Sequence, residues 1–291
     1  MIKPDFIIIG AAKSGTSSLF DYLRQHPEVF MPDRKEFHYF SYEEYVSHLE
    51  GPGDRANIEY ACGNKQDYYD AFSAGSGFHA VGEASPSYFQ YPAVPERIYN
   101  ELGPVKIIVM LREPVSRAFS NYKHMKRLGR ETLSFNDALL AERSRKERGW
   151  TEFWLYGEGG MYSEMLSRYI NQFGRDNIHV IIYEEFCRDL LKSVRGVYQF
   201  LGVDTQFKPD VRVIHNRSIQ YHYPFFQRVL ERLVEVESLH WRVKKILNQV
   251  GEKNIVSTAP NGEGVKLLRE RSSVDYKSLV EVLGRKIDWK D

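Results

Sequence analysis

The sequence predicts an α/β fold in which helices flank a central parallel sheet. Three apolar runs indicate the strands, and each is followed by a segment with helical spacing; they cover residues 6–9, 105–111 and 178–183. Continuous apolar runs, as opposed to alternating ones, are typical of strands that are buried on both faces of a parallel sheet. Three strand-then-helix units in succession favour right-handed crossovers within one sheet.

The segments after these runs begin with residue types that start helices. The first run ends at Gly10, and Thr16 and Ser17 can cap the helix that follows. The second run leads to Pro114, and proline is favoured in the first turn of a helix. After the third run, the apolar spacing predicts a helix over residues 184–201.

The remaining segments are less regular. Residues 31–104 have no sustained period, which predicts active-site loops with short helices. The spacing over 224–250 predicts two core-packing helices with a break near Ser238, and the alternating charge signs disfavour a membrane or partner role. The tail, 264–289, predicts one or two further helices that end at Gly284.

Length and composition limit the classes of protein that fit. A chain of 291 residues fits one large α/β domain, 1–291. With 40 Lys and Arg against 39 Asp and Glu, no overall charge draws it to nucleic acid or an anionic membrane. Two cysteines exclude a disulfide framework, so a reducing cytoplasm is the expected location. The first apolar run is far below the roughly 20 residues of a membrane span, and no signal-peptide cleavage region follows it. We therefore expect no nucleic-acid partner and no stable membrane insertion.

The loop after the first run predicts an anion site. A strand-glycine-helix corner points backbone N–H groups and the positive end of the helix dipole at one place. Lys13 adds an ammonium group to this corner. Ala11, Ala12, Ser14 and Gly15 are small enough for phosphate oxygens to approach the main chain. Such corners also occur as plain structure, but the lysine favours the anion site.

This loop does not match the phosphate loop of ATP-binding proteins. That pattern is G-x-x-x-x-G-K-[ST], whereas here Lys13 precedes the second glycine, Gly15. No apolar strand ends in an acidic magnesium ligand, because the second one runs into Arg112. A magnesium-dependent kinase is therefore disfavoured, and no metal site is expected.

Four segments resemble the sulfotransferases that use 3′-phosphoadenosine 5′-phosphosulfate (PAPS). Residues 11–19 (AAKSGTSSL) are similar to their 5′-phosphosulfate loop, and residues 111–122 (LREPVSRAFSNY) to their 3′-phosphate motif. The similarity continues through 35–40 (KEFHYF) and 83–89 (EASPSYF) and covers about residues 5–205. It is nearer the bacterial and heparan-sulfate branch than the cytosolic steroid and phenol branch. The resemblance implies a P-loop-like three-layer fold and metal-independent transfer of a sulfuryl group from PAPS.

The resemblance also implies roles for single residues in donor binding. Lys13 would hydrogen-bond the oxygen that bridges sulfate and 5′-phosphate, where charge develops as that bond breaks. Arg112 and Ser120 would hold the 3′-phosphate, to which a guanidinium fork is well suited. The residues implied for the 5′-phosphosulfate are Ser14, Gly15, Thr16, Ser17 and Ser18. The plain alternatives are a surface ion pair of Arg112 with Glu113 or another carboxylate, and a solvated helix position for Ser120.

Glu36 and His38 are the candidates for the base that removes the acceptor's proton. In an extended segment they would lie on one face, two residues apart. The resemblance to the heparan-sulfate branch implies Glu36 as base, with His38 as helper or alternative. The plain alternative for His38 is a histidine packed among aromatic side chains.

Two parts of the sequence depart from the family pattern or match it loosely. Ala84 stands where the family has a lysine, which weakens a sulfated-polysaccharide acceptor and favours a smaller or less acidic one. Glu83 before it is either a second acid/base group or a structural partner of Arg112 or Lys13. A mainly helical lid segment at about 215–260 is expected on the acceptor side, with Arg217 as a further 3′-phosphate contact.

The leading hypothesis is sulfuryl transfer from PAPS to an acceptor hydroxyl, or less often an amine. The acceptor would be a small molecule, a carbohydrate or a carrier-bound hydroxyl, among which the sequence does not choose. Two alternatives are a P-loop kinase of small molecules and a nucleotide-binding module without catalysis.

Overall fold

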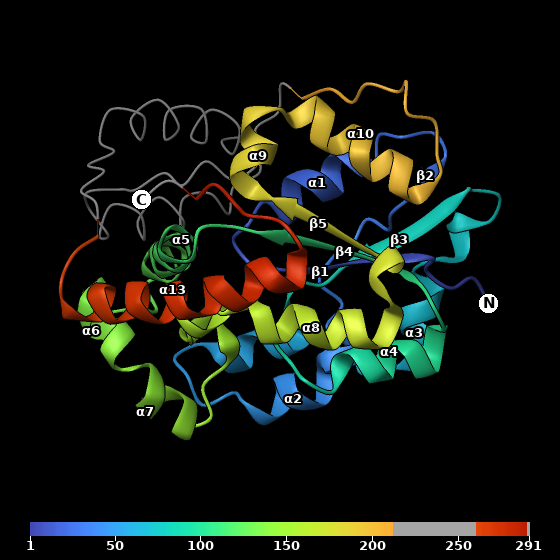
Figure 1. The fold of residues 1–291 in the computed structure, drawn as a ribbon. Coiled ribbons are helices and arrows are strands. Elements are labelled where there is room, and N and C mark those ends of the chain that lie inside the picture. Colours follow the sequence, from blue (N-terminus) through green and yellow to red (C-terminus); the bar gives the residue numbers. More distant parts are fainter. Residues whose placement is uncertain (212–259, 290–291) are drawn as a thin grey trace, which may run out of the picture.

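A parallel sheet of five strands lies at the centre of the computed structural model, which describes residues 1–211 and 260–289 (Figure 1). The central strand β1 (Phe6–Gly10) pairs with β3 (Ala80–Ala84) on one side and with β4 (Lys106–Leu111) on the other. The edges are β2 (Val29–Phe30), next to β3, and β5 (Ile178–Ile182), next to β4. The α/β fold with a parallel sheet is therefore confirmed.

Helices cover both faces of this sheet, which gives three layers (Figure 1). One face packs against α1 (Thr16–Leu23), α9 (Tyr183–Arg188) and α10 (Leu190–Leu201). The other face packs against α3 (Lys65–Asp70), α4 (Val94–Leu102), α8 (Tyr162–Phe173) and α13 (Glu263–Leu283). Within β1, Phe6 and Ile8 belong to the first interface while Ile7 and Ile9 belong to the second, as the period of a strand requires.

A third apolar cluster joins helices that lie beside the sheet in Figure 1. It joins α5 (Pro114–Arg127) and α6 (Phe135–Leu140) to the start of α13. The helices α7 (Glu142–Glu147) and α2 (Tyr42–Ser47) lie near the surface. Short 3-10 helices complete the described elements: η1 (Tyr39–Ser41), η2 (Asp54–Tyr60), η3 (Ser73–Gly75), η4 (Pro86–Phe89), η5 (Glu152–Trp154), η6 (Glu158–Gly160) and η7 (Arg175–Asn177).

The predicted strands agree with β1, β4 and β5 to within about one residue, but two strands were not predicted. β3 reads Ala-Val-Gly-Glu-Ala and lacks an apolar run. A Cβ added at Gly82 would overlap the ring of Phe6 on the neighbouring strand, so the space that a larger side chain would take is already filled. β2 has only two residues and carries no period of its own.

The helix predicted over 184–201 is two helices. Asp189 lies between α9 and α10, and its carboxylate accepts the N–H of Lys192 at 3.1 Å, which caps the second helix. The helix predicted in the tail is confirmed as α13, and Gly284 ends it in the left-handed conformation (φ 67°). The helices predicted in 224–250, the lid segment and Arg217 lie outside the described residues. Within the described ranges, no helix is long and apolar enough to cross a membrane.

Candidate active site

The loop between β1 and α1 has the conformation of an anion site. Lys13 is left-handed (φ 70°), and Gly15 (φ 94°) is the residue before the first turn of α1. A Cβ at Gly15 would lie 3.0 Å from the ring of Tyr183, so this position requires glycine both for its φ and for the close approach. We expected Thr16 or Ser17 to cap α1, but no side chain does so. The N–H groups of the first turn are therefore free to bind an anion.

The start of α5 holds this loop in place. Arg112 Nη1 donates to the carbonyl of Lys13 at 3.1 Å, and Arg117 Nη1 donates to that of Ala12 at 3.4 Å. The Arg112 guanidinium also lies over the ring of Tyr183, 4.4 Å from its centre. The two segments that resemble phosphate motifs are thus joined directly, although about one hundred residues separate them in sequence.

Arg112 and Ser120 do not have the plain roles that were the alternatives. The carboxylate of Glu113 caps α5 by accepting the N–H groups of Val115 at 2.8 Å and Ser116 at 2.6 Å. Glu113 therefore does not serve as the ion-pair partner of Arg112. Ser120 is only 8% exposed, so it is not a solvated helix position.

Further basic residues of α5 approach Lys13, and the sequence analysis missed them. Burial and the positive charges of Arg127 and Arg112 together lower the pKa of Lys13 to about 8, and the charge of Glu36 opposes them. Burial and the charges of Lys13 and Arg127 lower the pKa of His124 to about 3, so this imidazole is neutral. A signal was present: Ser120, His124 and Arg127 are spaced by four and three residues, which places them on one helix face.

The segment that carries the two base candidates crosses the end of β3. Glu36 donates its backbone N–H to the carbonyl of Ala84 at 2.8 Å. Its side chain is 37% exposed, and the Lys35 ammonium lies 3.8 Å from its carboxylate. Lys35 also donates to the hydroxyl of Ser17. Lys35 therefore links the Glu36 carboxylate to the phosphate loop.

The segment is not extended as we expected. Glu36 (φ 61°) and His38 (φ 55°) are both left-handed. Together with Lys13 they are the non-glycine residues of the described chain with positive φ, and they are also the three residues predicted to be catalytic. The left-handed conformation costs about 1–2 kcal/mol for such residues. Strain of this kind persists where the surroundings fix the backbone, and it is concentrated at functional sites.

The family model of the sulfotransferase domain matches residues 3–224 of this sequence. The chain belongs to the sulfotransferase family. A sulfotransferase from Alicyclobacillus acidocaldarius, whose crystal structure is known, shares 33% identity and a TM-score of 0.79, with 99% of this chain and 98% of that one aligned. The match extends over the sheet and the phosphate loop, so the three-layer sulfotransferase fold is confirmed.

Two curated relatives are similar over part of their length. The membrane-associated sulfotransferase kil1 of Dictyostelium discoideum is 33% identical over 121 residues, which are 41% of this chain and 22% of that protein. Heparan sulfate glucosamine 3-O-sulfotransferase 5 of Mus musculus is 26% identical over 216 residues, 69% of this chain and 54% of that protein. This sulfotransferase-family chain thus spans about half the length, or less, of these relatives.

His38 is buried among aromatic side chains in this member of the sulfotransferase family. Its ring stacks on Tyr45 with centres 4.5 Å apart, and its Nδ1 lies 2.8 Å from the hydroxyl of Ser87. Burial lowers the pKa of His38 to about 4, so the imidazole is neutral at pH 7. These surroundings match the alternative of a histidine packed among aromatic side chains. A catalytic role for His38 stays a prediction.

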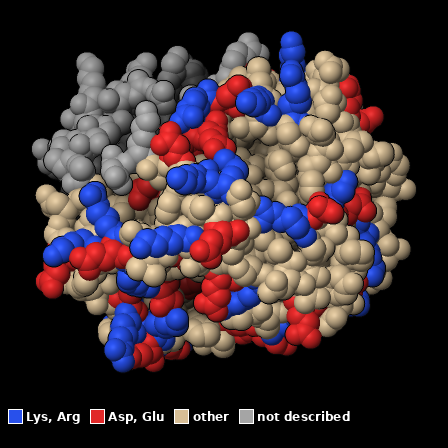
Figure 2. All heavy atoms as spheres, viewed as in Figure 1, with Lys and Arg blue, Asp and Glu red and all other residues tan. Residues whose placement is uncertain are grey.

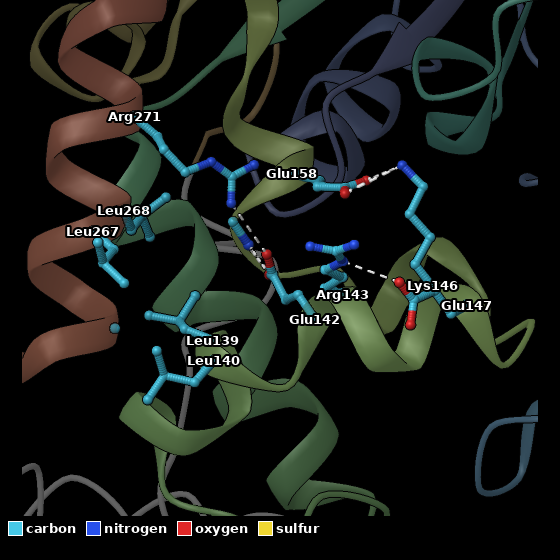
Figure 3. A pocket seen from close by; sticks show the side chains of 12 residues that line it. Leu139, Leu140, Glu142, Arg143, Lys146, Glu147, Glu158, Leu267, Leu268 and Arg271 are labelled. Atoms are coloured by element: carbon cyan, nitrogen blue, oxygen red, sulfur yellow. Dashed lines mark hydrogen bonds and ion pairs between the residues drawn. The ribbon is translucent and has the colours of Figure 1, made fainter.

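Away from the phosphate loop, a pocket of about 540 Å³ lies between α6, α7, η6 and α13 (Figure 3). Leucines form one side, and ion pairs of 3.0 Å (Arg143–Glu147) and 2.9 Å (Lys146–Glu158) lie on the other. No residue predicted for the active site lines this pocket. Positive and negative side chains also alternate over the surface shown in Figure 2, in line with the net charge of +1. Within residues 1–211 and 260–289, no cluster of three or more His, Cys, Asp or Glu side chains could hold a metal ion.

Proposed function

We propose that this chain transfers a sulfuryl group from PAPS to an acceptor hydroxyl, without a metal. The observation that carries the proposal is the meeting of Lys13, Arg112 and Glu36 at the start of α1. Arg112 donates a hydrogen bond to the carbonyl of Lys13. The negative charge of Glu36 lies close enough to Lys13 to oppose the lowering of its pKa. A cation, a guanidinium and a carboxylate are thereby placed around one anion-binding turn.

The residues present fit the two phosphate groups of the donor. The uncapped first turn of α1, including Thr16 and Ser17, would bind the 5′-phosphosulfate through N–H and hydroxyl groups. Arg112 would bind the 3′-phosphate, and its Nε is buried without a hydrogen-bond partner among the described residues. Ser120, on the helix α5 that follows Arg112, would add a hydroxyl. A phosphate would satisfy the buried guanidinium nitrogen.

Glu36, Lys13 and Lys35 would have separate roles in the transfer. Glu36 would take the proton from the acceptor hydroxyl while the acceptor oxygen bonds to sulfur. Lys13 would donate to the oxygen that bridges sulfur and the 5′-phosphate, and so offset the charge that forms as this bond breaks. Lys35, between Glu36 and Ser17, would keep the carboxylate facing the phosphate loop. The products are the sulfated acceptor and 3′-phosphoadenosine 5′-phosphate (PAP).

The acceptor we propose is a hydroxyl of a carbohydrate, a small molecule or a carrier-bound group. Relatives named for heparan sulfate support a carbohydrate. Ala84, in place of the family's lysine, supports one that is less acidic than a sulfated polysaccharide. A cytoplasmic location stays a prediction, as does the absence of stable membrane insertion.

The proposal is tested by measuring transfer from labelled PAPS to a panel of hydroxyl acceptors, with and without EDTA. We expect transfer that EDTA leaves unchanged and no transfer of phosphate from ATP. Loss of activity in EDTA would contradict the metal-independent mechanism and favour the kinase. Tight PAP binding without turnover on any acceptor would favour a nucleotide-binding module.

The pKa of Lys13 predicts how activity depends on pH. Only the ammonium form can offset charge on the leaving oxygen, and its pKa is lowered to about 8. We therefore expect kcat/KM to fall as the pH rises above about 8, by about tenfold per unit at the limit. Lys13→Arg retains the charge at high pH, so any activity that it keeps should fall less steeply with pH than the activity of the wild-type protein. A rate that is constant up to pH 10 in the wild-type protein would contradict the assignment.

A further inference from the structure

Glu83 is a buried carboxyl group that the proposed mechanism does not use. It lies near the end of β3, has 0% exposure, and neither of its oxygens has a well-formed hydrogen bond to a described residue. The sequence analysis offered Arg112 or Lys13 as its partner, yet neither is bonded to it. A buried polar group without such a partner is uncommon and needs a physical explanation.

The surroundings of Glu83 keep it neutral. The hydroxyl groups of Tyr68 on α3 and Tyr88 on η4 lie beside the carboxyl. Within the described part of the chain, the other titratable groups that interact with its charge are Tyr169 on α8 and the thiol of Cys62. No cation is among them. Burial raises the pKa of Glu83 to about 8, although the hydroxyl groups of Tyr88 and Tyr68 oppose this rise. At pH 7 the group is therefore mostly a neutral acid.

The aromatic residues that cover Glu83 come from the segment that carries the base candidates. The ring of Tyr68 is stacked on that of Tyr39 at 4.2 Å. Phe37 and Phe40 pack edge-on against the same ring, with centres 5.6 and 5.5 Å away. Tyr68 thus contacts both Glu83 and these three side chains, and all of them except Tyr39 are fully or almost fully buried. Water that reaches the carboxyl past Tyr68 requires this cover to move.

The residues directly after Glu83 also fix the backbone of this segment. The carbonyl of Ala84 accepts the N–H of Glu36 at 2.8 Å. The hydroxyl of Tyr88 accepts the N–H of Phe40 at 3.3 Å. The hydroxyl of Ser85 lies 3.4 Å from the intervening N–H of His38. Residues 84–88 thus bind every second backbone N–H group of residues 36–40, the segment that contains the left-handed Glu36 and His38.

We propose that Glu83 is a positioning residue, which as a neutral acid keeps the aromatic cover closed and so holds Glu36 in its left-handed conformation. The inference rests on the proposed sulfuryl transfer, in which Glu36 is the base. An ionised Glu83 would be a buried charge without a cation, and hydration is what relieves such a charge. Hydration requires the cover to open, which releases the backbone around Glu36.

The ratio of kcat in Glu83→Gln to kcat in the wild-type protein, measured from pH 6 to pH 9, tests this role. Glutamine imitates the neutral acid and cannot ionise. We expect a ratio near one at pH 6 that rises to about tenfold at pH 9, where about a tenth of Glu83 stays protonated. Both proteins contain Lys13, so its titration cancels in the ratio. A ratio that does not change with pH would overturn the proposal.

Glu142→Gln is the matched control. Glu142 is also a buried glutamate, and burial raises its pKa to about 7, but it lines the pocket of Figure 3, where the base segment does not reach. We expect its ratio to the wild-type protein to be independent of pH. A rise equal to that of Glu83→Gln would mean that any buried acid produces the effect, and would also overturn the proposal.

Hydrogen exchange of the peptide that contains residues 35–40 gives a readout that does not need activity. At pH 9 we expect faster exchange in the wild-type protein than in Glu83→Gln. Tyr88→Phe removes the acceptor of the Phe40 N–H, so it should exchange faster at every pH, and it serves if the glutamine variant does not fold. Equal exchange in all proteins contradicts the positioning role. Absence of sulfuryl transfer in the wild-type protein contradicts the proposed function instead, and the exchange result still decides the role of Glu83.

Discussion

Replacing Lys13 by methionine is expected to lower kcat about 10²–10³-fold, the usual cost of removing one donor to a developing oxyanion. Lys13 is held in a left-handed turn by the bond from Arg112 to its carbonyl, so the backbone that carries its side chain is already fixed before the donor binds. Methionine has nearly the same length and keeps the packing of the stem. The measurement is single-turnover transfer from labelled PAPS at saturating acceptor.

Two controls show whether the loss of kcat in Lys13→Met is specific to bond breaking: the affinity for PAP and a second lysine variant. PAP has no sulfate, so its binding should weaken far less than kcat in Lys13→Met. Lys192→Met, which changes an exposed lysine on α10, should leave both quantities unchanged. Equal losses of PAP affinity and kcat would mean that Lys13 only binds the phosphate and takes no part in the breaking of the bond.

Glu36→Gln is expected to lower kcat by about 10²–10⁴, the range that a positioned base contributes. Glutamine keeps the shape and the backbone bond to Ala84 but cannot take the acceptor's proton. Isothermal titration with PAP should show binding close to that of the wild-type protein, because the phosphate contacts come from other residues. Transfer lost while binding is retained would also exclude the nucleotide-binding module.

Glu43→Gln is the control for this variant. Glu43 has a side chain that is 80% exposed, and it pairs with Arg97 at 3.0 Å. Its change should alter neither transfer nor binding. If Glu36→Gln transferred at the wild-type rate, Glu36 would be removed from the mechanism. His38 would not easily replace it, since its imidazole is buried and bonded to Ser87.

The sequence predicted the strands whose neighbours leave room for large side chains. β1, β4 and β5 are rich in isoleucine and valine, and all three were found. β3 was missed because its central residue is Gly82. The ring of Phe6 on the neighbouring strand fills the space that a side chain at this position would take, and a local sequence pattern does not show such a contact. The break at Asp189 was missed although its signal is local, since aspartate is a favoured N-cap residue and the apolar spacing begins at Leu190.

The donor side of the site was predictable from sequence, and the base side was predictable only in part. Lys13 and Arg112 follow strands directly, so the fold itself brings them to one edge of the sheet. Glu36 and His38 were named, but their left-handed backbone depends on contacts with residues 84–88, more than forty positions away. The neutral state of Glu83 likewise depends on burial in the folded protein, which no local pattern shows.

The helix α13 supports the nucleotide site from a distance. Its Asp275 caps α8 by accepting the N–H of Tyr162 at 2.8 Å, and Trp289 packs against the Tyr162 ring with centres 6.0 Å apart. The Tyr162 hydroxyl in turn donates to the carbonyl of Arg112 at 2.8 Å. Asp275 lies more than 150 positions after Arg112, yet it is linked to Arg112 through Tyr162. We therefore expect a change that loosens α13 to weaken the nucleotide site without touching it.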